Sequence, residues 1–439
     1  MTTKSLTKNH PLAGKKMMGA DMIVQILADE GVDTIFGYSG GAILPTYDAV
    51  FRFNEENKDS DGNQPMPLIV PANEQGAGFM ASGYARASGK VGVVMVTSGP
   101  GATNTVTPIR DCMADSIPIV VISGQVPTTA IGTDAFQEAP VSAIMGAVSK
   151  HIFLVTDPLL LESTIRSAFE LAKTGRPGPV VVDIPKDIQN WEGEFLGSGS
   201  LPLTGYRNRL ETVMNNNLND ELAKNFYKLL SKSKKPLIYA GGGVINADAS
   251  SQLRQFSETY KIPIVTTLMA LGASDTTKSL SLHMLGMHGL ASANYAVEDC
   301  DFLIAIGARF DDRVAGDPKG FAPNAKKIAH FDIDISEINK VKSVDWYHVG
   351  NLKKDLNDLI TLGKKIEFVS DFSGWHSHIE KLKEEYKLNY NKNSELIQPY
   401  EVIEEINKLS RGEAIISTGV GQHQMWAAQY LDYEEPRLW

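Results

Sequence analysis

The feature that most constrains the fold is a recurring unit in which a short apolar segment runs directly into a loop of glycine, proline and small polar residues. In the first part of the chain these segments lie at residues 34–36, 68–70, 91–96, 118–122 and 180–183, with helical patterns between them. Alternation of short apolar strands with helices predicts a parallel, doubly wound sheet. The loops GYSGG, PANEQG, TSGPGATN, SGQVP and DIPKD would then meet at the carboxyl edge of that sheet, where such folds bind ligands.

The same unit returns later in the chain. The segments PLIYAGGGV, IPIVTT, DFLIAIGARF and KKIAHFDID predict a second α/β domain. A helix at 399–409, a strand EAIIST and the loop and helix TGVGQHQMWAAQYL begin a third unit, which stops at Trp439, too soon for a closed domain of about 100 residues. The predicted fold class is therefore α/β, with successive doubly wound parallel-sheet domains of which the third is incomplete.

Stretches that lack apolar periodicity mark the borders between these domains. Glycine, proline, serine and asparagine accumulate after Lys186, which is typical of a linker, and a charged, partly helical stretch follows the second domain. We expect a disordered tail at 1–17, a first domain at 18–188, a linker at 189–217, a central domain at 218–363, a linker at 364–395 and the start of a third domain at 396–439.

The composition excludes several classes of function. A net charge of -10 argues against nucleic acid as a partner, and no apolar run approaches the roughly 20 residues that cross a bilayer. Cys112 and Cys300 lie far apart without metal-type spacing, so we expect two buried thiols in a reducing compartment. The N-terminal segment has no secretory apolar core; a remnant of an organelle-targeting peptide is the alternative to a disordered tail.

Single motifs each have a plain structural interpretation beside a functional one. Three glycines at 241–243 would let backbone amides approach a phosphate, and a tight strand-to-helix turn explains them equally well. Arg309 and Arg313 could reach a diphosphate or lie in solvent. Glu74, taken alone, is an acid that complements the positive end of a helix.

Taken together, the motifs favour the functional interpretation. GYSGGAILPTYDA, PANEQGAGFMASGYARASG, TSGPGATN, DAFQE, GRPGPVVVDIPKD, MLGMHG, GARFDDRV and TGVGQHQMWAAQ resemble, in this order, the catalytic large subunit of acetohydroxyacid synthases, also called acetolactate synthases. The resemblance implies a pyrimidine-binding domain, a central FAD-binding domain and a diphosphate-binding domain. It also implies a site completed across a dimer interface.

The resemblance further implies a thiamine-diphosphate-dependent carboligase that uses Mg²⁺ and FAD. Such an enzyme decarboxylates pyruvate and joins the two-carbon fragment to a second pyruvate or to 2-ketobutyrate, in the biosynthesis of valine, leucine and isoleucine. The flavin is expected to be structural because the net reaction needs no redox step. The partners implied are small 2-keto acids and a second copy of the chain in a homodimer or homotetramer, with a small regulatory subunit as an optional partner and with no nucleic acid and no membrane.

The resemblance assigns roles to individual residues. Glu74 is expected to hydrogen-bond N1′ of the aminopyrimidine and to promote the imino tautomer, which removes the proton from the thiazolium C2. Gln137 and Phe136 are expected near the reacting carbons, Gly41 beside the aminopyrimidine and Lys186 at the substrate entrance. The residues expected around the diphosphate of thiamine are Gly421, Gln422 and His423. Those expected around FAD are Arg176, Gly241, Gly242, Gly243, Thr267, Leu268, Met269, His288, Gly307, Arg309, Arg313, Asp332 and Ile333.

Three departures from the family pattern carry expectations of their own. Ser39 replaces the usual proline of GYPGG, so we expect a less rigid loop, and Asn351 replaces an aspartate beside the flavin. No metal ligand is assigned within the chain, because the segment that holds Mg²⁺ would lie after Trp439. We therefore expect little turnover from this chain alone.

Two alternatives to the carboligase remain open from the sequence. One is a pyruvate oxidase or related carboligase with a redox-active flavin, which GARFDDRV and Gln137 disfavour. The other is a catalytically silent flavin-binding protein. The expected location is the cytoplasm, with the plastid stroma or mitochondrion as the alternative.

Overall fold

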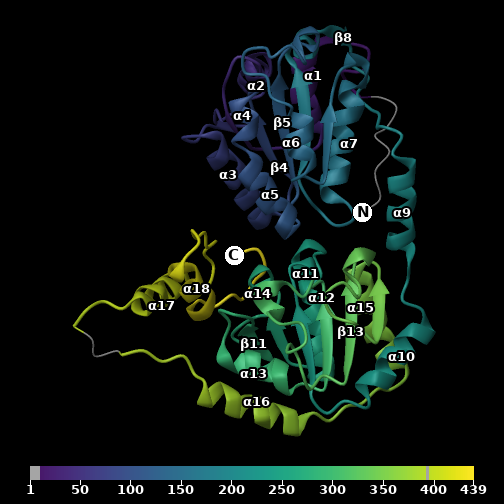
Figure 1. Cartoon of the computed structure of the whole chain (residues 1–439), viewed down its shortest axis with the longest axis vertical. Coiled ribbons are helices and arrows are strands. Elements are labelled where there is room, and N and C mark those ends of the chain that lie inside the picture. The colour runs from purple at the N-terminus through teal and green to yellow at the C-terminus, as the bar shows by residue number, and fades with distance from the viewer. Residues whose placement is uncertain (1–9, 392–394) are drawn as a thin grey trace. The chain divides into compact units, whose positions relative to one another are not determined.

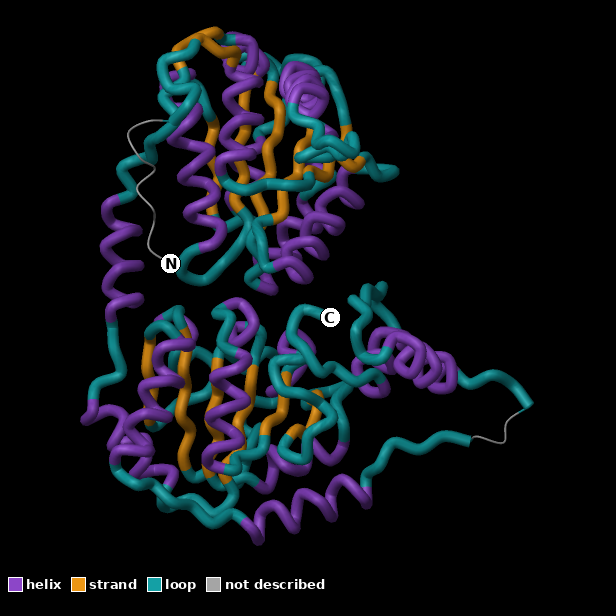
Figure 2. The backbone as a smooth tube through the Cα atoms, turned by 180° about the vertical axis from the view of Figure 1, so that it is seen from behind, coloured by secondary structure: helices purple, strands orange, loops and turns teal. Residues whose placement is uncertain are grey.

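The computed structural model describes residues 10–391 and 395–439 and divides the chain into two compact units, Met1–Gly205 and Tyr206–Trp439. Figure 1 shows the two units in purple to teal and in teal to yellow, and Figure 2 shows that each contains strands flanked by helices. Each unit is described below by itself.

The first unit is a doubly wound sheet of six parallel strands in the order β3-β2-β4-β5-β7-β6. Its strands are β2 (Ile35–Tyr38), β3 (Leu68–Ile69), β4 (Gly92–Val96), β5 (Ile119–Gln125), β6 (His151–Leu154) and β7 (Val180–Pro185). Its α-helices are α1 (Gly19–Asp29), α2 (Leu44–Glu56), α3 (Glu74–Ser88), α4 (Pro100–Thr103), α5 (Val106–Asp115), α6 (Val141–Gly146), α7 (Leu161–Lys173) and α8 (Lys186–Asn190), with 3₁₀ turns η1 (Thr128–Ala130) and η2 (Pro158–Leu160).

Burial explains why these strands are almost wholly apolar. Every residue of β4, β5 and β7 is buried, as expected for central strands of a parallel sheet covered on both faces. Helices α1 and α7 pack together, and α3 packs on α5, β2 and β4. The sequence prediction of a parallel, doubly wound α/β sheet is confirmed for this unit.

The tail expected at 1–17 is ordered from residue 10 onward. The short strand β1 (Lys16–Met18) pairs antiparallel with β8 (Glu192–Glu194), and His10 Nε2 lies 3.2 Å from Asp29 Oδ1. The prediction of disorder is therefore wrong for residues 10–17, because partners far along the chain hold this segment. Residues 1–9 lie outside the described residues.

The second unit contains another parallel six-stranded sheet, in the order β11-β10-β9-β12-β13-β14. Its strands are β9 (Pro236–Ala240), β10 (Ile264–Thr266), β11 (Ser281–Met284), β12 (Phe302–Ile306), β13 (Lys327–Asp332) and β14 (Trp346–Val349). Its α-helices are α10 (Asp220–Leu230), α11 (Gly243–Asn246), α12 (Ser250–Tyr260), α13 (Ala291–Asp299), α14 (Asp312–Ala315), α15 (Leu352–Lys365), α16 (Ser373–Glu385), α17 (Pro399–Ser410) and α18 (Gln422–Tyr430), with 3₁₀ turns η3 (Leu268–Ala270) and η4 (Ile335–Glu337). Helix α9 (Thr204–Asn215) occupies most of the C-terminal half of the expected linker at 189–217.

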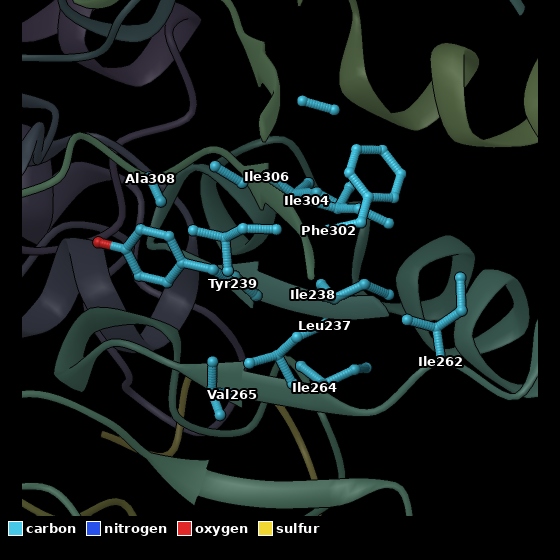
Figure 3. Packing of buried hydrophobic residues seen from close by; sticks show 14 of the residues in the cluster. Leu237, Ile238, Tyr239, Ile262, Ile264, Val265, Phe302, Ile304, Ile306 and Ala308 are labelled. Atoms are coloured by element: carbon cyan, nitrogen blue, oxygen red, sulfur yellow. The ribbon is translucent and has the colours of Figure 1, made fainter. Parts of the chain in front are cut away.

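The core of this unit is built on its central strands. Figure 3 shows side chains of β9, β10 and β12 packed together, with the hydroxyl of Tyr239 directed away from the aliphatic cluster. The four residues Leu237, Ile238, Leu303 and Ile304 are fully buried in this cluster. Burial of such side chains contributes about 1.5–3 kcal/mol each.

Within the second unit, the C-terminal segment packs on the sheet domain through a smaller apolar cluster. Ala427, Ala428, Leu431 and Tyr433 lie against Leu271 and Met284. The strand predicted for EAIIST at 413–418 does not form. Ile416 N donates one backbone hydrogen bond to Leu438 O at 2.7 Å, and among the described residues no neighbouring strand supplies the ladder that a β-strand requires.

The two cysteines are buried thiols, as the sequence predicts. Cys112 and Cys300 are free and buried, and burial raises the pKa of each thiol to about 12. Within the described part of the chain, no helix combines the length and hydropathy needed to cross a bilayer.

Candidate functional site

The carboxyl edge of the first sheet has its topological switch point between β2 and β4. Strand order runs outward from β2 to β3 on one side and through β4 and β5 on the other, so the loops after β2 and β4 lie at the position where such sheets bind ligands. Ala42 N donates to Thr97 Oγ1 at 3.2 Å, which ties the GYSGG loop to the TSGPG loop. A Cβ on Gly40 would lie 2.5 Å from Thr97 Cγ2, so only glycine permits this approach.

Glu74 is the first residue of α3 and is 9% exposed. Asn73 caps the helix by accepting a hydrogen bond from Gly76 N at 2.8 Å, which fixes the backbone on which Glu74 is mounted. Asn104 Nδ2 donates to Glu74 Oε2 at 2.9 Å. Burial, with the nearby charge of Glu74, raises the pKa of Tyr47.

The second carboxylate oxygen of Glu74 has a different environment. Among the described residues no hydrogen bond reaches Oε1, and a Cβ on Gly101 would lie 3.5 Å from it. Gly41 has no atom within 4 Å of its own Cβ position. These residues fit the aminopyrimidine of thiamine diphosphate, because one oxygen is held, the other is available, and glycines line the approach.

Gln137 and Phe136 lie in the loop after β5, at the same edge of the sheet. Gln137 has a φ of 59°, and a Cβ on Gly99 would lie 2.4 Å from Gln137 O, so this loop packs directly on the TSGPG loop. Phe136 is 88% exposed. The structure therefore brings Gln137 close to the loop next to Glu74 and leaves the Phe136 ring projecting from the unit.

Lys186 begins α8 directly after β7 and is half-buried. The next residue, Asp187, accepts hydrogen bonds from Thr128 N at 3.0 Å and Thr128 Oγ1 at 2.5 Å. Lys186 is thus mounted on a short helix that is tied to the start of the loop carrying Gln137.

In the second unit, the residues predicted around FAD gather at the corresponding carboxyl edge. Gly241–Gly243 follow β9 and Gly307 follows β12, on the two sides of the switch point in a 3-2-1-4-5-6 strand order, which is typical of dinucleotide-binding sheets. A Cβ on Gly241 would lie 2.2 Å from Gly307 O, and one on Gly242 would lie 3.0 Å from Met269 Cβ. The glycines are therefore needed for close packing of these loops, whichever ligand they serve.

Further residues of this set surround the same edge. Thr267 and Leu268 follow β10, and the hydroxyl of Thr267 is buried without a hydrogen-bond partner among the described residues. An unpaired buried hydroxyl is costly, so it fits a site for a polar ligand such as FAD. Asp332 ends β13 and its Oδ1 accepts from Asp334 N at 2.9 Å, with Ile333 next to it.

The three arginines and His288 of the predicted FAD set lie in different elements. Arg309 lies after β12 with Nη2 3.6 Å from Asp311 Oδ2, and Arg313 lies in α14. The carbonyl of His288 accepts from Gln429 Nε2 at 2.8 Å. Arg176 lies in the first unit, before β7 and so at the edge opposite Glu74, where its Nε donates to Ser116 Oγ at 2.9 Å.

The remaining predicted positions concern the diphosphate, the metal and Asn351. Gly421 precedes α18, whose first residues are Gln422 and His423, so backbone amides are available at this helix start. Asn351 caps α15 by accepting from Lys354 N at 3.2 Å. No group of three or more His, Cys, Asp or Glu side chains among the described residues is arranged to hold a metal ion.

Asn104 and Thr97, which orient Glu74 and the GYSGG loop, are functional residues that no sequence pattern points to individually. Both lie within the quoted motif TSGPGATN, as its last and first residues. Their contacts join segments about 30 and 55 positions apart, which no local pattern reveals.

Comparisons with known proteins identify the family of this chain. Residues 17–144 match the family model for the N-terminal TPP binding domain of thiamine pyrophosphate enzymes, and residues 223–359 match the model for their central domain. The acetolactate synthase large subunit of Corynebacterium glutamicum is 45% identical over 436 residues, which is 99% of this chain and 67% of that protein.

Plant proteins show similar identity. The chloroplastic acetolactate synthase of Arabidopsis thaliana is 43% identical over 96% of this chain and 61% of its own length, and acetolactate synthase 1, chloroplastic, of Oryza sativa subsp. japonica is 45% identical over 96% and 63%. The chain thus spans 61 to 67% of the length of these relatives. By this similarity, and by its two thiamine pyrophosphate enzyme domains, the chain belongs to the acetolactate synthase large-subunit family of thiamine-diphosphate-dependent enzymes.

Proposed function

We propose that this protein catalyses the decarboxylating carboligation of pyruvate with a second pyruvate or with 2-ketobutyrate, giving acetohydroxy acids for branched-chain amino-acid biosynthesis. The observation that carries the proposal is the environment of Glu74. This acid is buried at a helix start and has one oxygen fixed by Asn104 and the other available beside Gly101. Bound thiamine diphosphate supplies the carbon nucleophile and the electron sink of the reaction.

The residues of the first unit would act around that cofactor. Glu74 Oε1 would hold and exchange the proton at N1′ of the aminopyrimidine, and the glycines at 40, 41 and 101 would let the ring lie against backbone. Gln137 and Phe136 would border the reacting carbons. Lys186 would attract the carboxylate of the 2-keto acid, because its cation offers local charge in an acidic protein.

The second unit would hold FAD without a redox role. The residues proposed to surround the dinucleotide are Arg176, Gly241–Gly243, Thr267–Met269, His288, Gly307, Arg309, Arg313, Asp332 and Ile333. Gly421, Gln422 and His423 would meet the thiamine diphosphate phosphates, with Mg²⁺ as the metal partner. The proposed assembly is a homodimer or homotetramer, with a small regulatory subunit as an optional partner.

Product analysis tests the proposed reaction. The protein expressed from its full gene is supplied with thiamine diphosphate, Mg²⁺, FAD and pyruvate, with and without 2-ketobutyrate. We expect acetolactate, and acetohydroxybutyrate when 2-ketobutyrate is present, in the same yield with and without oxygen. Acetate or hydrogen peroxide as the main product would assign an oxidase instead, and retained flavin with no product would assign a silent flavin-binding protein.

A further inference from the structure

A buried acid lies between two central strands of the first unit, outside the site described above. Asp183 on β7 pairs in register with Ser123 on β5, and each of these residues is 1% exposed. Ser123 Oγ donates to Asp183 Oδ1 at 2.6 Å, and Gln125 Nε2 donates to Asp183 Oδ2 at 2.9 Å. Burial of a carboxylate in this position destabilises the fold unless the carboxylate is hydrogen-bonded. A hydrophobic residue would fill the space between the strands at a smaller cost in folding free energy.

Gln125 is fixed in a single orientation by its partners. It is 3% exposed, and its Oε1 accepts from Val126 N at 2.8 Å. Its Nε2 donates both to Asp183 and to the carbonyl of Ala139, the latter at 3.3 Å. A flipped amide would turn its oxygen toward a carboxylate and a carbonyl, so the acid at 183 decides which way the amide of Gln125 faces.

The carbonyl that Gln125 holds belongs to the loop that carries Gln137. Glu138 closes this loop by accepting from Gly132 N at 2.5 Å and from Ala135 N at 3.0 Å. Gln137 itself has a φ of 59°, in the left-handed region that residues other than glycine seldom occupy. A strained backbone of this kind persists only where its surroundings fix it.

We propose that Gln125, oriented by Asp183, is a positioning residue that holds the 132–139 loop and thereby sets the place of Gln137 beside the TSGPG loop. The inference rests on the proposed function, in which Gln137 borders the reacting carbons. Asp183 and Gln125 touch no reacting atom in this account. They act through the backbone at Ala139, two residues beyond Gln137.

Isosteric variants separate positioning from packing. Gln125→Met fills the same volume without a donor, and Asp183→Asn keeps the shape of the acid but removes its charge. Asn54→Leu is the matched control, because Asn54 is also a buried amide that holds a loop backbone, through Met66 O at 2.8 Å and Met66 N at 3.0 Å, but it acts before β3, at the opposite edge of the sheet.

Acetolactate formation by the protein from its full gene provides the first readout. We expect Gln125→Met to lower kcat/KM roughly ten- to hundredfold, Asp183→Asn to lower it less, and Asn54→Leu to change it less than about threefold. In a Gln137→Ala background, Gln125→Met should have little further effect, because the side chain that it positions is gone. An equal loss in both backgrounds would overturn the positioning role alone, whereas full activity of Gln137→Ala would overturn the role of Gln137 and the positioning role with it.

Amide hydrogen exchange gives a second readout that does not depend on turnover. Gln125→Met and Asp183→Asn should speed exchange at the amides of Gly132 and Ala135, while Asn54→Leu should not. If Gln125→Met fails to fold, the exchange rates of Asp183→Asn are compared with those of Asn54→Leu instead. Unchanged exchange at these amides in Asp183→Asn would contradict the proposal even if the protein makes acetolactate.

Discussion

At the scale of single residues, two buried acids of the first unit have opposite relations to their surroundings. Both carboxylate oxygens of Asp183 accept hydrogen bonds from side chains of β5, whereas Glu74 has one oxygen held by Asn104 and the other facing Gly101. A residue that is buried yet incompletely paired is expected where a ligand completes its hydrogen bonds. This contrast separates the acid proposed to act on the cofactor from the one proposed to hold a loop.

The environment of Asp183 predicts a pH-dependent stability. Burial raises the pKa of this carboxyl from 3.8 to about 6, although hydrogen bonds from Ser123 and Gln125 oppose the rise. Since the folded pKa lies above the unfolded value, ionisation destabilises the folded unit. The cost is absent below the unfolded pKa and complete above the folded one, where it amounts to about 3 kcal/mol.

Asp183→Asn removes this titration. When the pH is lowered from 7.5 to 4, the free energy of unfolding of the unmodified protein should rise by roughly 2–2.5 kcal/mol relative to that of the variant. Urea unfolding at each pH, monitored through hydrogen exchange at the amides of β5 and β7, measures this difference in the free energy of unfolding. The same pH dependence in both proteins would show that Asp183 ionises as freely in the folded state as in the unfolded chain.

At the scale of elements, the loops after the strands determine how closely the strands can meet. In the second unit, Gly241 and Gly243 pack against Gly307 across the switch point, with Cβ positions 2.2 Å from Gly307 O and 2.8 Å from Gly307 Cα. The motifs predicted that glycine is needed here. They did not reveal that the reason includes loop-to-loop packing, because Gly307 follows a different strand.

A methyl group at position 241 should separate these two loops. We expect Gly241→Ala to lower the free energy of unfolding of the second unit by roughly 1–3 kcal/mol and to reduce the FAD retained after purification. Gly374→Ala in α16 is the control, since no atom lies within 4 Å of its Cβ position, and it should be neutral or stabilise by up to about 1 kcal/mol. Equal stability and flavin content in the two variants would refute the packing argument.

The elements that the sequence missed are mostly at sheet edges. The central strands β4, β5, β9 and β12 each contain a run of apolar residues, and the sequence predicted all four. Of the strands in the two six-stranded sheets, those not predicted are β6, β11 and β14, which end their sheets and read HIFL, SLHM and WYHV, with polar residues among the apolar ones. An edge strand is covered less completely, so its sequence carries a weaker pattern.

At the scale of the whole molecule, the two units repeat one principle with different strand orders. Each sheet places its glycine-rich loops at a switch point, between β2 and β4 in the first unit and between β9 and β12 in the second. Which loops belong to one edge could be predicted from the sequence, because parallel strands share a direction. The contacts that set the chemistry of the site, such as Asn104 to Glu74 and Gln125 to Ala139, could not, because they depend on side-chain orientation in the folded units.

The most direct test of the account is the rate at which bound thiamine diphosphate exchanges its C2 proton for deuterium. In the protein from its full gene, saturated with thiamine diphosphate and Mg²⁺, we expect Glu74→Gln to slow this exchange by about 100-fold or more while the fold is kept, because an amide cannot exchange the proton at N1′. Gln75→Ala, a change at the exposed neighbouring position, should exchange like the unmodified protein. Exchange in Glu74→Gln at the rate of the unmodified protein would contradict the central claim that Glu74 controls this proton.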